Sequence, residues 1–276
     1  MIFKFNTKKA LLFFFKYPHL KTFYKNGILD FNSIVNIYKN IIDKNESCEL
    51  FGKRFFGLTP VNYYTLDEVF TSNVYEFNTE KNTPLIIDCG ANIGLSMLYI
   101  KQKHSNAIIH AFEPDSVNYS YLEKNIDSFG WNDTVFKYQK LVSDKTGYEF
   151  FEELGNAGSK ISKSDTGKKI EKIRLSDFIE NLNQEIDFLK IDIEGSEFAV
   201  LPDLKKNFPK IKKMYVEFHC EDSDFQKFHS YINNLLSEHF DFQITTNFTE
   251  NENIYDSISK KNVKTYYNCF AVNKIK

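Results

Sequence analysis

From residue 84 onward, short apolar runs alternate with stretches of helical periodicity. The runs are rich in Ile, Phe, Tyr and Val and have the length of buried strands, at 84–89, 107–113, 134–143, 186–193, 212–220, 240–246 and 265–273. Helix candidates lie between most of them, at Leu95–Lys103, Val117–Phe129, Leu175–Asn183 and Asp224–His239. Strands that alternate with helices predict an α/β fold, with a doubly wound and mostly parallel seven-stranded sheet covered by helices on both faces.

Three parts of the chain depart from this alternation. Residues 1–80 lack strand periodicity and predict a helical and irregular N-terminal extension to a domain over residues 81–276. Residues 144–172 hold four of the chain's eleven glycines, which predicts a hairpin or flap rather than a crossover helix. This segment is either a lid over a binding site or a plain solvent-exposed hairpin. The polar residues 247–264 predict a loop.

The N-terminal stretch is basic and partly apolar. Six lysines precede the first acidic residue, Asp30, and the apolar run 10–15 is only six residues long. No small-residue cleavage site follows this run, so we expect a helix of the folded protein rather than a signal peptide. Such a helix either contacts an anionic membrane surface or exposes a solvated lysine face while it packs on the main domain. We favour the second interpretation.

Charge and cysteine usage narrow the class of protein. The net charge of −2 and the pI of about 6.3 give no reason to expect a nucleic-acid partner. The four cysteines are far apart in the sequence and form no C-x-x-C pair, which predicts free, buried thiols in a reducing compartment. No apolar stretch approaches the roughly 20 residues of a membrane span. We therefore expect a cytoplasmic protein, with at most a peripheral contact at the inner membrane surface.

The loop after the first predicted strand is a candidate ligand site. In open parallel sheets, ligands bind beyond the carboxyl ends of the strands. The sequence there is DCGANIG, in which Gly90 and Gly94 allow a sharp turn and a close approach of a ligand to the backbone. The spacing is G-x-x-x-G rather than the G-x-G-x-x-G of dinucleotide enzymes, which disfavours an NAD-dependent reductase. Asp88, directly before the turn, would repel a diphosphate and suits a cationic ligand.

The end of the second predicted strand completes this interpretation. Glu113 ends that strand nineteen residues after Gly94, where an acidic residue can accept hydrogen bonds from a ribose diol. The ligand should therefore be a nucleoside that carries a positive charge and no phosphates. S-adenosylmethionine fits this description, and we predict it as the cofactor. The alternative is a tight strand–helix turn beside a solvated glutamate.

The motifs from residue 63 to residue 273 resemble those of the FkbM-type class I S-adenosylmethionine-dependent methyltransferases. IIDCGANIG, HAFEPD, LVSDKTG, FLKIDIEGSE and YVEFH are similar to that family's first five motifs and follow in its order. The run 265–273 is similar to the antiparallel last strand of that fold. The resemblance implies O-methylation of a sugar or polyketide hydroxyl. It assigns Asp88, Gly90, Asn92 and Gly94 to the cofactor loop, Glu113 to the ribose, Ser143 and Asp144 to the adenine, and Tyr75 either to the methionine end or to the core.

Catalytic candidates follow the fourth and fifth predicted strands. Asp192 and Glu194 alternate by two and should point the same way, as should Glu217 and His219. His219 suits a general base near neutral pH, oriented by Asp192 or Glu217, and its alternative is a partly buried structural histidine. Glu197 is expected to cap or pair. The four carboxylates and the histidine could instead bind a divalent metal, as in catechol-type methyltransferases. The Asp, Asp and Asn pattern of those enzymes is missing from these motifs, so we expect no metal.

These observations lead to one principal function and its alternatives. We expect a cytoplasmic O-methyltransferase that acts on a hydroxyl of a sugar, glycan or glycolipid precursor. The acceptor could instead be a polyketide or another small metabolite. From a different class, the chain could be a binding protein that keeps the cofactor fold without turnover, although the intact cofactor motifs argue against this. The sequence leaves the oligomeric state open.

Overall fold

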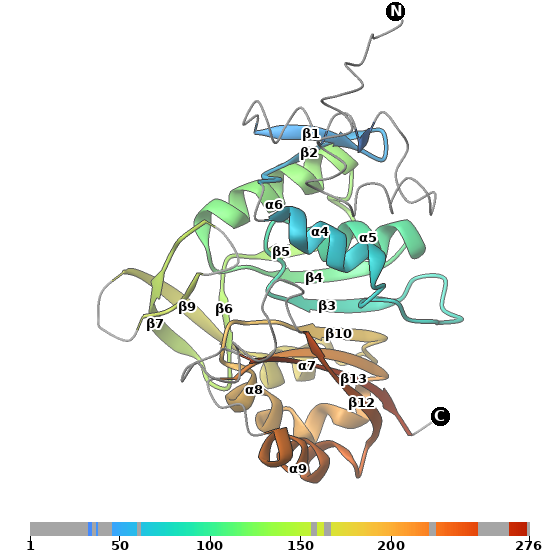
Figure 1. Cartoon of the computed structure of the whole chain (residues 1–276), viewed down its shortest axis with the longest axis vertical. Helices are drawn as coiled ribbons and strands as arrows, with labels where there is room; N and C mark the ends of the chain where they lie inside the picture. The colour runs from blue at the N-terminus through green and yellow to red at the C-terminus, as the bar shows by residue number, and fades with distance from the viewer. Residues whose placement is uncertain are drawn as a thin grey trace, which may run out of the picture.

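The structure is a computed structural model that describes most of the chain. The described residues are 33, 34, 37, 46–59, 62–155, 159–162, 167–220, 225–247 and 265–274. The predicted basic helix near the N-terminus lies outside them, as does the predicted loop over 247–264 apart from Asn247, which is the last residue of a strand. Figure 1 shows the arrangement of the helices and strands.

In the described part of the chain, seven strands form the main sheet. Their spatial order is β12 (Phe240–Asn247), β13 (Thr265–Asn273), β11 (Lys213–Cys220), β10 (Phe188–Ile191), β3 (Leu85–Cys89), β4 (Ile108–Phe112) and β5 (Val135–Tyr138). The pairs from β11 to β5 are parallel, whereas β13 runs antiparallel to both β11 and β12. The predicted doubly wound sheet with an antiparallel last strand is confirmed.

Helices cover both faces of this sheet (Figure 1). One face carries α4 (Asn62–Thr71), α5 (Leu95–Lys103) and α6 (Ser116–Phe129), and the other carries α7 (Leu175–Leu182), α8 (Glu197–Asp203), the short 3-10 helix η1 (Lys205–Lys210) and α9 (Phe225–Leu236). Within β3, Ile86 packs on the first face and its neighbours Leu85 and Ile87 pack on the second. Both faces of the strand are therefore apolar, as the continuous apolar run of its sequence predicts.

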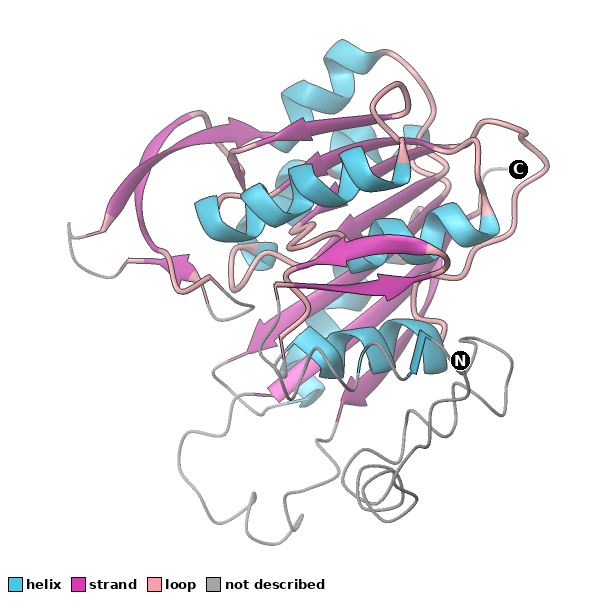
Figure 2. Cartoon of the chain, turned by 90° about the horizontal axis from the view of Figure 1, so that it is seen from above, coloured by secondary structure: helices cyan, strands magenta, loops and turns pink. Residues whose placement is uncertain are grey.

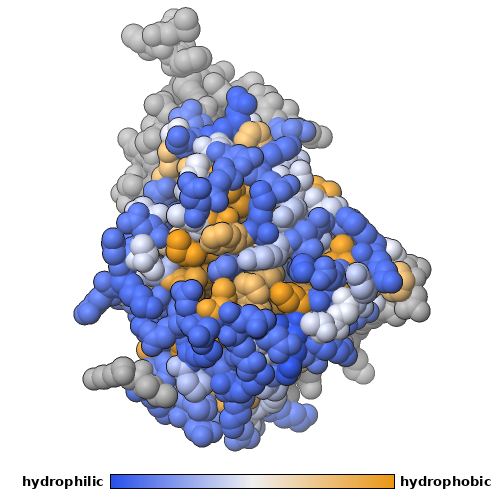
Figure 3. Space-filling view, turned by 180° about the vertical axis from the view of Figure 1, so that it is seen from behind, coloured by the Kyte–Doolittle hydropathy of each residue, from blue (hydrophilic) through white to orange (hydrophobic). Residues whose placement is uncertain are grey.

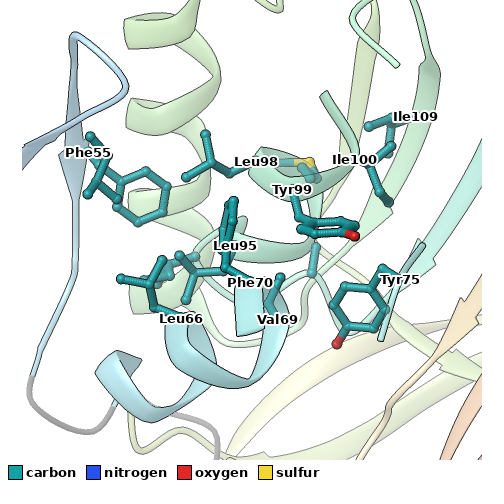
Figure 4. Packing of buried hydrophobic residues seen from close by; sticks show 14 of the residues in the cluster. Phe55, Leu66, Val69, Phe70, Tyr75, Leu95, Leu98, Tyr99, Ile100 and Ile109 are labelled. Atoms are coloured by element: carbon teal, nitrogen blue, oxygen red, sulfur yellow. The ribbon is translucent and has the colours of Figure 1, made fainter. Parts of the chain in front are cut away.

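The region before residue 80 differs from the prediction. It contains a β-hairpin, β1 (Ser47–Leu50) with β2 (Lys53–Phe56), where helical and irregular structure was expected. The hairpin and α4 pack into the same hydrophobic core as α5 and the sheet, and Figure 4 shows Phe55, Phe70 and Tyr99 in this packing. The rings of Phe70 and Tyr99 meet edge to face with centroids 5.3 Å apart. Two short strands joined at Phe51 and Gly52, both with positive φ, are too brief to produce a strand periodicity in the sequence.

The segment expected to form a hairpin or flap builds a second sheet. Its spatial order is β6 (Leu141–Ser143), β9 (Lys168–Arg174), β7 (Gly147–Glu152) and β8 (Lys160–Ile161). Figure 2 shows this curved sheet at one side of the main sheet. The single strand predicted over 134–143 is wrong, because the chain leaves the main sheet after Tyr138 and β6 pairs with β9 instead.

The surface and the thiols agree with a folded globular unit. Seen from behind, the molecule is mostly hydrophilic, with hydrophobic residues gathered near the centre of that face (Figure 3). All four cysteines are free and buried, which confirms the prediction from their spacing. Among the described residues, every helix is too short or too polar to cross a bilayer.

Candidate active site

A cavity of about 570 Å³ lies at the carboxyl ends of the central parallel strands. Most of the predicted site residues line it together: Tyr75, Gly90, Asn92, Glu113, Asp192, Glu194, Glu217 and His219. Asp88, Gly94, Ser143 and Asp144 are outside this lining. The switch-point rule for open parallel sheets therefore placed the site correctly.

The turn after β3 is held by a close approach between two parts of the backbone. Gly90 has φ +87°, and the amides of Gly90 and Ala91 donate to the carbonyl oxygen of Phe112. A Cβ built on Gly90 would lie 1.8 Å from the carbonyl oxygen of Asp192. The loop after β10 therefore occupies the space that a side chain at position 90 would need. This contact joins the predicted cofactor loop to the predicted catalytic loop.

A buried lysine connects the same two loops. The Lys190 ammonium lies 3.3 Å from a carboxylate oxygen of Asp88 and 3.3 Å from one of Asp192, and it donates to the carbonyl oxygen of Gly90 at 2.8 Å. Burial by itself lowers the pKa of Lys190, but the two carboxylates raise it above its ordinary value. Asp88 also accepts a hydrogen bond from Ser96. Asp88 therefore fixes the position of the loop through its contacts with Lys190 and Ser96. A contact between Asp88 and the ligand stays a prediction.

Glu113 is fixed by the backbone of the loop it faces. One of its oxygens accepts from the amide of Asn92 at 2.8 Å and the other accepts from the amide of Asp115 at 2.9 Å. Burial raises the pKa of Glu113 to about 7, against the lowering effect of these two amides. Each carboxylate oxygen keeps a second lone pair, so Glu113 can accept hydrogen bonds from a ribose diol without losing its position.

Asp115 ties the second sheet to this part of the site. It caps the N-terminus of α6 by accepting from the amides of Val117 and Asn118. Its other oxygen accepts from the amide of Gly155 and, at 2.6 Å, from the hydroxyl of Ser159. Five described residues of the second sheet and its loops line the cavity: Leu141, Val142, Phe151, Ser159 and Ile161. The segment is therefore part of the cavity wall, while its action as a lid stays a prediction.

Ser143 and Asp144 lie at the start of this second sheet, where the Ser143 hydroxyl donates to the Asp144 carboxylate. The cavity is instead lined by the three residues before them, Lys140, Leu141 and Val142. The break between β5 and β6 explains the offset, since the chain bends away before it reaches the predicted residues.

His219 is held by a fully buried glutamate. Its Nδ1 lies 3.0 Å from the carboxylate of Glu197, which also accepts from the amides of Ile193 and Gly195. Its Nε2 faces the cavity, 3.6 Å from Glu194 and 3.9 Å from Asp192. Of the two roles predicted for Glu197, pairing is confirmed, because it pairs with His219 and accepts from amides of the turn before α8 rather than capping the helix. Glu197 takes the orienting role expected of Asp192 or Glu217.

This environment changes the chemistry expected of His219. Burial lowers the pKa of His219, but the hydrogen bond with Glu197 and the nearby carboxylates raise it to about 9. At neutral pH the imidazole of the unliganded protein carries its proton and acts as a donor. Glu217, on the same strand, has its pKa raised to about 8 by burial and by repulsion from Asp192 and Glu68. At neutral pH both His219 and Glu217 therefore hold a proton in the unliganded protein, and neither is a ready proton acceptor.

Tyr75 is a core residue that also lines the cavity, and its contact with the methionine end of the cofactor stays a prediction. It is buried, and its ring meets that of Tyr215 edge to face with centroids 5.1 Å apart. The Lys190 ammonium lies 5.7 Å from the centre of the Tyr75 ring. Tyr75 also lines the cavity, so it is a core residue with one side toward the site.

Comparisons with known proteins agree with this geometry. The profile of the methyltransferase FkbM domain matches residues 88–244. A protein of Streptomyces tacrolimicus named 31-O-demethyl-FK506 methyltransferase FkbM is 30% identical over 191 residues, which cover 56% of this chain and 74% of the relative. Methyltransferase sdnD of Sordaria araneosa is 29% identical over 189 residues, 54% of this chain and 72% of the relative. Among solved structures, methyltransferase FkbM from Methylobacillus flagellatus has a TM-score of 0.48 at 17% identity, covering 91% of this chain and 58% of that chain.

The fold and the site define a class I methyltransferase with S-adenosylmethionine as its cofactor. The chain belongs to the FkbM methyltransferase family, because the family profile covers more than half of it. The resemblance seen in the motifs and the predicted cofactor are thereby confirmed.

Proposed function

We propose that this protein is an S-adenosylmethionine-dependent O-methyltransferase that acts on a hydroxyl group of a sugar or glycan precursor. The observation that carries the proposal is a single cavity in which Glu113 lies with Asp192, Glu194, Glu217 and His219. Glu113 accepts from the ribose of the cofactor. The other four present hydrogen-bonding groups to a polyhydroxylated acceptor, as expected for a sugar.

The reaction needs alignment and the removal of one proton. The hydroxyl oxygen forms a bond to the methyl carbon as the bond from that carbon to the sulfonium breaks, and the hydroxyl proton passes to a protein carboxylate. Holding the two reactants in line can supply roughly 7–11 kcal/mol, whereas a general base adds about 10²–10⁴-fold. We assign the hydroxyl proton to Asp192, with the protonated His219 and Glu217 as hydrogen-bond donors that position the acceptor.

A second candidate acceptor is a polyketide or another small metabolite with a free hydroxyl. This acceptor class is supported by the name of the Streptomyces tacrolimicus relative, which gives 31-O-demethyl-FK506 as the compound that the relative methylates. Turnover assays with panels of sugars and of hydroxylated polyketides distinguish the two acceptors. Cofactor binding without turnover on either panel would favour a non-catalytic binding protein.

The cofactor half of the proposal is tested by the change Glu113→Gln. We expect S-adenosylmethionine to bind roughly 10–100-fold more weakly, because one charged acceptor of the ribose diol is lost. Calorimetric titration measures this, with the demethylated product as a second ligand and NAD as a ligand that should not bind. Glu123→Gln is the matched control, since Glu123 is half-exposed on α6 and pairs with Lys137 outside the cavity. Equal affinity in both variants would remove Glu113 from the ribose site.

A further inference from the structure

Two carboxylates and one imidazole converge on a small volume at the acceptor side of the cavity. One ligand-type atom from each of Asp192, Glu194 and His219 can be chosen so that all three lie within 4.8 Å of one another. Ligands bound about 2.1 Å from a common ion lie about 3.0–3.4 Å apart. The observed separations of 3.6 Å and 3.9 Å from Nε2 need side-chain movements of less than about 1 Å to reach that geometry.

The histidine is already oriented as a metal ligand would be. Histidines that bind metals usually donate their second ring N–H to a carboxylate, which fixes the tautomer and the direction of the free lone pair. Glu197, which is fully buried and outside the group of three, takes the Nδ1 side of His219. The Nε2 side is thereby directed to Asp192 and Glu194.

The wall of the cavity carries more carboxylates than cationic side chains. Among the described residues that line it, the carboxylates are Glu68, Glu113, Asp192, Glu194 and Glu217, and the cationic side chains are Lys140, Lys190 and the protonated His219. The one net positive charge of S-adenosylmethionine and the raised pKa values of Glu113 and Glu217 offset this excess, so the case for a metal ion rests on the geometry of its three ligands.

We propose that Asp192, Glu194 and His219 bind one divalent metal ion, replacing the expectation that the protein uses none. The ion displaces the proton from Nε2 of His219, so in the metal-loaded protein the ion takes the place of His219 as the group that orients the acceptor. Carboxylates suit Mg²⁺ and Mn²⁺, whereas imidazole suits the later first-row ions such as Fe²⁺ and Zn²⁺. Mn²⁺ is a first-row ion that accepts carboxylate oxygens, so it is the probe chosen for this mixed set. All three residues line the cavity and are partly exposed to it, with 25%, 29% and 9% of their side chains accessible. An ion can therefore reach them and keep open positions toward the acceptor.

The role of this ion, unlike its binding, rests on the proposed function. Two neighbouring hydroxyl oxygens of an acceptor could fill the open positions, which would orient one of them toward the methyl group. The acceptor class is then a compound with adjacent oxygen ligands, such as a vicinal diol. Sugars provide this arrangement.

The binding is tested with Mn²⁺ on the full chain by electron paramagnetic resonance. We expect one Mn²⁺ per chain and a ¹⁴N coupling to the bound ion, since an imidazole is the nitrogen ligand in the proposed set. Glu194→Gln should weaken binding at least tenfold, and His219→Gln should abolish the nitrogen coupling. Glu238→Gln, on an exposed residue that pairs with Lys205, is the matched control and should bind as the parent does.

The same samples separate failure of the metal site from failure of the proposed function. Calorimetry on each sample measures S-adenosylmethionine binding and shows that the site is folded. Cofactor binding without Mn²⁺ binding would overturn the metal site and leave the methyltransferase assignment intact. Equal Mn²⁺ affinity in Glu194→Gln and Glu238→Gln would also overturn it. Mn²⁺ binding with the expected nitrogen coupling, but without cofactor binding, would support the metal site and contradict the cofactor site.

Discussion

Replacing Lys190 with methionine is expected to lower the free energy of unfolding by about 3–5 kcal/mol. The side chain of Lys190 is 2% exposed and that of Asp88 is fully buried, so neither charge has water to solvate it. Methionine fills much of the same space but removes the positive charge that Asp88 and Asp192 share. The carboxylates of Asp88 and Asp192 would then lie close together with no cation between them. The charge of the buried Asp88 would have no ion-pair partner.

Denaturant unfolding followed by circular dichroism measures the loss. Lys101→Met is the matched control, because Lys101 is also buried but donates to neutral oxygens of Ser105, Ala107 and Thr134. Its replacement should cost about 1–3 kcal/mol. Asp88→Asn combined with Lys190→Met should cost clearly less than the two single changes added together, because the unpaired buried charge is gone. Additive costs, or a Lys190→Met loss no larger than that of Lys101→Met, would contradict the ion-pair interpretation.

The main sheet could be predicted because its strands are buried on both faces. A continuous apolar run such as 84–89 can satisfy its backbone and its side chains in the centre of a parallel sheet, and β3 occupies 85–89. The last strand, Thr265–Asn273, has the predicted bounds. A long apolar run bounded by polar connections can be assigned to a buried strand with few alternatives.

The second sheet could not be predicted for the opposite reason. Its two longest strands, β7 and β9, mix polar with apolar residues. In β9, KKIEKIR, exposed and buried positions alternate within a charged sequence. The parallel pairing of β6 with β9 joins residues about thirty positions apart, and local periodicity carries no information about that partner. The hairpin predicted within residues 144–172 is confirmed by the antiparallel pairing of β7 with β9, whereas the single strand predicted over 134–143 is wrong.

At the site, residue types were predictable but their pairings were not. Glycines and acids at strand ends indicated the cofactor loop and Glu113. The part played by Lys190 depends on its register in β10, where it stands opposite Asp88 of β3. A lone lysine inside the apolar run FLKI is a signal that could have been used, since a buried charge requires a partner. The raised pKa of His219 depends on Glu197, twenty-two positions away, and no spacing rule connects the two.

Replacing Gly90 with alanine is expected to lower the free energy of unfolding by about 2–5 kcal/mol, as the sum of two costs. The first, about 1–2 kcal/mol, is the placement of a Cβ at φ +87°. The second, about 1–3 kcal/mol, is the collision of that Cβ with the Asp192 carbonyl oxygen, because a backbone atom cannot move aside as a side chain can.

Gly130→Ala separates these two costs. Gly130 ends α6 at φ +72°, and among the described residues nothing lies within 4 Å of a Cβ built there, so it should show the conformational cost alone. Thermal and denaturant unfolding of both variants measure the difference in stability, and titration with S-adenosylmethionine measures the difference in cofactor affinity. Relief of the collision must push the cofactor loop away from the Asp192 loop, so Gly90→Ala should lose cofactor affinity while Gly130→Ala keeps it. Equal stability and affinity in the two variants would mean that the close contact between the two loops does not hold the site together.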